Sequence, residues 1–80
     1  MEHTYTIEAR DVPGALVRMT QVFARRGYSI RSLNVRPYKA GEFAIIDIIA
    51  RDVERPEQLE YQLEKLVDIN KVTVHRHHEA

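Results

Sequence analysis

The chain contains no cysteine, which excludes disulfide bonds, thiolate metal sites and thiol nucleophiles and leaves its stability to packing alone. It also lacks an excess of charge of either sign, because twelve lysine and arginine residues balance twelve aspartate and glutamate residues. Without a basic excess to neutralise phosphates, nucleic acid is not an expected partner. Charged residues make up 30% of the sequence and are too scattered for a membrane span.

The N-terminus lacks the basic and apolar regions of a secretory signal, so we expect a cytoplasmic protein. A chain of 80 residues lies near the lower limit of what folds around one core, and such a domain buries only about 60% of its unfolded surface. We therefore predict a single domain over residues 1–80, with a core at about residues 4–76, for which partners matter.

Hydrophobic periodicity predicts a strand, a helix and a second strand in the first half of the chain. Apolar and polar residues alternate over residues 4–10, as expected of a strand with one buried face. Residues 15–24 carry apolar side chains at helical spacing. The next strand, residues 28–38, should begin irregularly or contain a bulge, because Ile30 and Leu33 differ in parity.

The second half of the chain predicts a turn, a strand, a helix and a last strand. Residues 39–42 read as the turn of a hairpin, and residues 43–50 form the most apolar run, typical of a strand buried on both sides. Pro56 suits a first helical turn, and leucines follow at helical spacing up to Asp68. Residues 72–75 alternate again in a short strand.

This βαββαβ order predicts an α+β, ferredoxin-like domain: a four-stranded antiparallel sheet with both helices on one face. Right-handed crossovers would place the first and third strands in the centre. In the third strand, one set of alternating residues should lie under the helices: Ala44, Ile46, Ile48 and Ala50. The other set should lie on the open face and dock a partner protein: Phe43, Ile45, Asp47 and Ile49.

The loop between the first strand and the first helix, residues 11–16, is the candidate binding site. Its helix-start amides at Gly14, Ala15 and Leu16 lack intrahelical partners. They lie at the positive end of the helix dipole, so they can hold a carboxylate. Asp11 is placed to accept hydrogen bonds from an ammonium group. Together they suit a free amino acid. The alternative is that Asp11 is an ordinary helix cap before Pro13.

Three segments, in order, resemble a known family. Residues 11–16 (Asp-Val-Pro-Gly-Ala-Leu) are similar to the D-x-P-G-x-L signature of ACT domains. Residues 23–35 resemble the F-x-x-R-G-Y-N-I-x-S-L-x-V run of acetolactate (acetohydroxyacid) synthase small subunits, and residues 62–72 resemble their Q-L-x-K-L-x-D-V-x-x-V stretch. Ordered matches over about residues 5–74 are far more specific than any single short motif.

The resemblance implies a regulatory subunit, not an enzyme by itself, that binds the catalytic large subunit of acetolactate synthase in branched-chain amino-acid synthesis. Thiamine diphosphate would belong to that catalytic subunit, and no cofactor to this chain. The resemblance also implies a homodimer that holds an amino-acid effector, usually valine, between its two copies. The implied effector-binding residues are Asp11, Val12, Pro13, Gly14, Ala15 and Leu16 of one copy, with Ser29 and Ile30 of the other.

Two departures from the family leave questions open. Valine-sensitive members commonly carry asparagine at the positions of Asp11 and Ser29, so valine, leucine, isoleucine or no effector remain alternatives, as do activation and inhibition. Longer members have a second C-terminal domain, so the chain is either a short subunit or a fragment. The competing function is a stand-alone ACT module that regulates another enzyme of amino-acid metabolism.

Other functions have weaker support. The histidines His3, His75, His77 and His78 suggest a metal, but a solvated chain end explains the last two, and no metal site is expected. The third strand lacks the paired aromatics of an RNA-binding platform. No nucleophile, phosphate loop or convergent acid–base pair points to catalysis.

The second strand should lie at an edge of the sheet, with no proline before Pro37 to block pairing with another strand. This favours a homodimer joined through the second strand.

Overall fold

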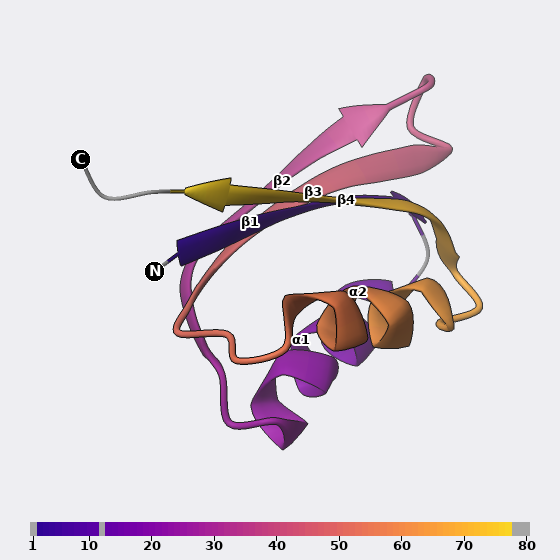
Figure 1. Ribbon diagram of the computed structural model, residues 1–80. Helices are drawn as coiled ribbons and strands as arrows, with labels where there is room; N and C mark the ends of the chain where they lie inside the picture. Colours follow the sequence, from indigo (N-terminus) through magenta and orange to yellow (C-terminus); the bar gives the residue numbers. More distant parts are fainter. Residues whose placement is uncertain (1, 12, 78–80) are drawn as a thin grey trace.

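The computed structural model describes residues 2–11 and 13–77, and it has the expected element order. The elements are β1 (Glu2–Arg10), α1 (Ala15–Arg25), β2 (Ser29–Tyr38), β3 (Phe43–Arg51), α2 (Pro56–Glu64) and β4 (Ile69–His77). The strands form one antiparallel sheet in the order β2-β3-β1-β4, and both helices lie on one side of it (Figure 1). This confirms the ferredoxin-like α+β fold with the first and third strands in the centre.

The predicted irregularity in β2 is also present. Its register with β3 shifts between Ile30 and Ser32, so Arg31 stands between two regular stretches of the ladder. The shift reconciles the opposite parity of Ile30 and Leu33, and both side chains end on the helix side of the sheet. A second shift, between Glu8 and Ala9 where β1 meets β4, had no counterpart in the sequence pattern.

Two predicted boundaries in the C-terminal half were wrong. The second helix ends at Glu64 rather than Asp68, because hydrogen bonds of the Leu66 amide to the Leu63 carbonyl and the Ile69 amide to the Leu66 carbonyl close tight turns. Leu66 still packs on the core from this turn, which explains why the apolar spacing outlasts the helix. The last strand is longer than predicted, since pairing with β1 extends it over Ile69–His77.

The core lies between the sheet and the two helices. Tyr5 of β1 packs edge-on against Phe23 of α1, with ring centroids 5.5 Å apart, and its hydroxyl donates to the Pro56 carbonyl at 3.3 Å. This contact ties β1 to the start of α2. Burial raises the pKa of the Tyr5 hydroxyl, so it remains a neutral donor. Among the described residues, no helix has the length and apolar character to cross a membrane.

The two faces of β3 separate as predicted. Ala44, Ile46, Ile48 and Ala50 are all buried in the core under the helices. The remaining set, Phe43, Ile45, Asp47 and Ile49, alternates with them and so lies on the open face. Ile45 lies on that open face but is only 9% exposed in the isolated chain, with side chains of β1 and β4 around it.

The helical layer leaves the middle of β2 uncovered, although Ile30 at the start of the strand packs against the core. Leu33 and Val35 share the helix side with Ile48 and Ile46, their partners on β3. Yet Leu33 and Val35 are 42% and 48% exposed, whereas Ile48 is fully buried. The edge strand therefore presents apolar side chains to solvent on the side where the other strands are covered.

Candidate functional site

The loop between β1 and α1 leaves the start of the helix open. Gly14 is the N-cap residue, with φ 87° and ψ −13°, and no described side chain caps this end of α1. Asp11 stands three residues before the cap, so the alternative that Asp11 caps the helix is wrong. The amides of the first helical turn remain available to an external acceptor, and the helix dipole adds partial positive charge there.

The loop lies against the hairpin that joins β2 to β3. The Asp11 amide donates to the Glu42 carbonyl at 3.1 Å, while the Asp11 side chain is exposed. A shallow hollow of about 400 Å³ opens beside this contact, lined by Arg10, Asp11, Gly41, Glu42 and Phe43. Pro13 and Gly14 are exposed, Ala15 is buried and Leu16 is partly exposed; Val12 lies outside the described residues.

Arg18 is a residue of this site that the sequence pattern did not single out. A Cβ atom on Gly14 would lie 2.9 Å from Arg18 Nη1, so the guanidinium rests against the loop one helical turn on. The same guanidinium forms an ion pair with Asp68 of the turn before β4. Arg18 therefore places a guanidinium, paired with Asp68, beside the first turn of α1 and links the loop to the C-terminal half of the domain.

The other two predicted effector residues lie elsewhere in the same chain. Ser29 opens β2 and pairs with Arg51, which in turn pairs with Glu2 at the start of β1. The loop follows the opposite end of β1, about 26 Å away at 3.3 Å per strand residue. One copy of the chain thus does not bring Ser29 and Ile30 to the loop, and only a second copy could.

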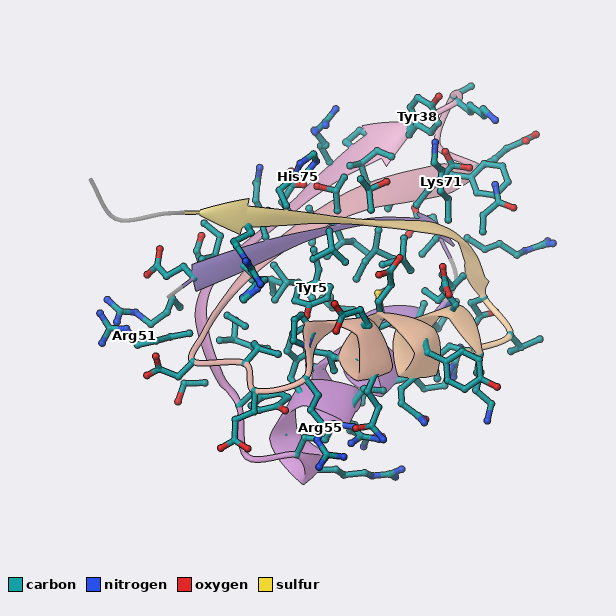
Figure 2. The ribbon with its side chains drawn as sticks, in the orientation of Figure 1. Tyr5, Tyr38, Arg51, Arg55, Lys71 and His75 are labelled. Carbon is teal, nitrogen blue, oxygen red and sulfur yellow. The ribbon has the colours of Figure 1, made fainter. Side chains whose placement is uncertain are left out.

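The open face of the sheet is more polar than the sequence suggested. The Thr6 hydroxyl donates to the Asp47 carboxylate at 2.7 Å, and Asn70 donates to Glu8. Figure 2 shows Tyr38, Lys71 and His75 on this side and Tyr5 on the opposite side, toward the helices. The apolar part of the face is a strip along β3 formed by Phe43, Ile45 and Ile49.

A second hollow, of about 200 Å³, lies between the start of α2 and the edge of the sheet. Its lining residues are His3, Pro56, Glu57, Glu60, Val74 and Arg76. Burial, together with the charges of Glu64 and Glu57, raises the pKa of Glu60. His3 is on this helix side, whereas His75 pairs with Thr4 and points to the open face, so the two histidines do not converge.

Among the described residues, no group of three histidine or carboxylate side chains suits a metal ion. His78 and the side chain of His77, which the sequence analysis also considered, lie outside the described residues.

Replacing Glu60 by glutamine should raise the stability of the domain slightly at pH 7. A raised pKa means that the folded state disfavours the charged carboxylate, so its charge costs stability above that pKa. Like charges one turn apart on an exposed helix cost about 0.3 kcal/mol, and salt screens them. Chemical denaturation as a function of pH measures the gain, which should vanish below about pH 4, where both states are protonated. Glu54→Gln, outside α2, is the charge-matched control.

Comparison with known proteins matches most of the chain, including the loop, to one family. The family described as the AHAS small subunit-like ACT domain matches residues 6–71. The acetolactate synthase small subunit of Mycobacterium leprae is 37% identical over 71 residues, which cover 88% of this chain and 42% of that protein. The chloroplastic acetolactate synthase small subunit 1 of Nicotiana plumbaginifolia is 42% identical over 71 residues, 88% of this chain and 16% of that protein.

Solved structures agree. The acetolactate synthase small subunit of Thermotoga maritima superposes with a TM-score of 0.81 at 31% identity, covering 92% of this chain and 47% of that one. The ACT domain from GTP pyrophosphokinase of Chlorobium tepidum has a TM-score of 0.75 at 14% identity, covering 92% of this chain and 96% of that one, which shows the shared fold. The chain spans about two fifths of the mycobacterial relative's length.

Proposed function

Because the chain belongs to the AHAS small subunit-like family of ACT domains, we propose that it is a regulatory module of acetolactate synthase. In this role it binds a small amino acid and modulates a catalytic large subunit, to which thiamine diphosphate belongs. The module itself supplies binding surfaces rather than catalytic groups.

The uncapped start of α1 is the observation that carries this proposal. Gly14 adopts a left-handed conformation, no described side chain caps the first-turn amides, and the Arg18 guanidinium lies beside Gly14. A carboxylate on these amides would be held by both the helix dipole and a nearby cation. The exposed Asp11 carboxylate, or the loop backbone beside it, would receive the ammonium group of the same amino acid.

The side chain of the effector is expected to be aliphatic. Leu16 is 37% exposed at the loop, and Ile30 of a second copy is half-buried at the start of β2. These two apolar surfaces suit a branched-chain amino acid, with valine as the first candidate and isoleucine or leucine as competitors.

A homodimer joined through β2 completes this site. The strand is a sheet edge whose backbone groups lack a neighbouring strand on one side, and unpaired edges favour pairing with an identical edge. Leu33 and Val35 strengthen the case, because they are apolar, exposed and not covered by either helix. A second copy beside β2 would bury them.

The open sheet face is the proposed docking surface for the catalytic subunit. Phe43, Ile45 and Ile49 form its apolar strip, and Asp47, held by Thr6, contributes a charged centre. The helices occupy the other face, so only this one remains accessible along the length of β3.

Titration calorimetry with valine, leucine and isoleucine, combined with an activity assay of the catalytic subunit, tests the function. We expect saturable binding of one of these amino acids and a change in synthase activity when the chain is added. Binding of an amino acid without any effect on the synthase would instead favour a stand-alone module that serves another amino-acid enzyme. Absence of both would contradict the proposal.

A further inference from the structure

The free edge of β2 is regular over only a short stretch. At one end, the register shift between Ile30 and Ser32 leaves Arg31 as an irregularity of the strand. At the other end stands Pro37, which has no backbone N–H to donate. A second strand can therefore add to this edge without interruption along residues 32–36.

Pro37 also indicates which backbone groups point outward. It pairs with Ala44 inside the β2–β3 ladder, where a missing N–H is tolerated only if that position faces the free edge. Outward and inward groups alternate along an antiparallel strand. Leu33 and Val35 have the same parity as Pro37, so their N–H and C=O groups face outward.

From this pattern we propose that β2 pairs with β2 of a second copy about a two-fold axis that passes through Asn34. This register rests on the homodimer of the proposed function. A two-fold axis makes an antiparallel strand pair symmetric about one point. The midpoint of residues 32–36 is Asn34. In this register Leu33 lies opposite Val35 of the second copy, and their outward groups exchange both hydrogen bonds.

Other symmetric registers lose interactions. An axis at Val35 would place Leu33 opposite Pro37, where one hydrogen bond is missing in each copy. An axis at Leu33 would set Val35 opposite the irregular Arg31. An axis at Arg36 would bring two like charges directly together on the open face, which is destabilising.

The side chains fit the Asn34 register on both faces of the sheet. On the helix side, the exposed Leu33 and Val35 pack against each other across the axis. On the open face, Asn34 meets its own copy, and two amide groups can hydrogen-bond to each other. Arg36 lies opposite the small, polar Ser32, so no like charges oppose.

The same register assembles the effector site. It places the start of β2 of the second copy, with Ser29 and Ile30, beside Tyr38 at the far end of the first copy's β2. The hairpin that follows Tyr38 carries the Glu42 carbonyl that accepts the Asp11 amide. The two halves of the site, about 26 Å apart in one chain, thus meet between two chains.

Disulfide trapping tests the register, because the chain has no cysteine of its own. Asn34 and its copy would form a non-hydrogen-bonded pair with Cα atoms about 4.5 Å apart, within the range that a disulfide spans. Asn34→Cys should therefore convert almost completely to a covalent dimer under mild oxidation. Ser32→Cys and Arg36→Cys should each remain uncrosslinked alone but crosslink to one another when mixed.

Val67→Cys, on the highly exposed turn before β4, measures random collisional crosslinking. The register is overturned if reduced Asn34→Cys sediments as a dimer but does not crosslink above the Val67→Cys level, or if Ser32→Cys or Arg36→Cys crosslinks efficiently by itself. The homodimer in turn fails if the unmodified chain sediments only as a monomer at tens of micromolar. Effector titration of the same sample then shows separately whether the amino-acid site survives without a dimer.

Discussion

Replacing Ile49 by lysine is expected to weaken assembly with the catalytic subunit by about thirtyfold or more while the domain stays folded. Ile49 is half-buried on the open face, beside Thr4 and opposite Ser32. In the free chain a lysine can extend from this position into water. In the complex its charge would be buried without a partner, which at an interface centre costs about 2 kcal/mol or more, a loss of affinity of about thirtyfold.

Titration of the catalytic subunit with the variant, followed by activity and co-elution, measures this loss. Val17→Lys is the matched control: it adds the same charge at an apolar, β-branched residue that is 57% exposed and lies on α1, on the helix side of the sheet. Ile45→Lys is a poorer test, because Ile45 is already buried and its loss mixes folding with docking. Undiminished assembly of a folded Ile49→Lys chain would rule out the open face as the docking surface.

Replacing Gly14 by valine should reduce effector affinity by at least tenfold. The residue would need φ near 87°, which costs a non-glycine residue about 1–2 kcal/mol and more when it is β-branched. Its Cβ would also press on the Arg18 guanidinium. Both effects disturb the amides on which the carboxylate is proposed to rest. Titration calorimetry on the folded variant gives the change in affinity.

Gly27→Val separates backbone strain from loss of the site. Gly27 has a similar φ of 74°, no described residue other than its chain neighbours lies within 4 Å of its added Cβ, and it follows the opposite end of α1. The two variants should lose comparable stability in thermal unfolding, but only Gly14→Val should lose most of its effector affinity. Unchanged binding by a folded Gly14→Val chain would place the effector site elsewhere.

Local patterns in the sequence were sufficient for the fold and for proposing one half of the candidate site. Strand and helix periods differ, so the alternation in β1, the short apolar run of β3 and the stripe in α1 predicted these elements. The parity change between Ile30 and Leu33 predicted the irregularity in β2. The candidate loop could be singled out because the amides at a helix start lack intrahelical partners whatever the rest of the chain does.

Features that depend on distant residues were not predictable. Side chains from β1 and β4 lie around Ile45. No pattern within β3 indicates which side chains of other strands will cover it. Asp68 reaches Arg18 from fifty positions further along the chain, so their ion pair is visible only after folding. The end of α2 was missed because Leu66 keeps helical spacing while it packs from a turn.

The sequence by itself therefore determined the order of elements, the orientation of β3 and the choice of the candidate loop, because each depends on residues that are neighbours along the chain. Only the tertiary structure decided that the helices leave Leu33 and Val35 of β2 uncovered, and that Ser29 and Ile30 lie at the far end of the sheet from the loop. The reason is physical: the position of a helix over a sheet depends on the packing of many side chains at once. The distance between the candidate loop and the start of β2 is set by the length of β1, which runs between them.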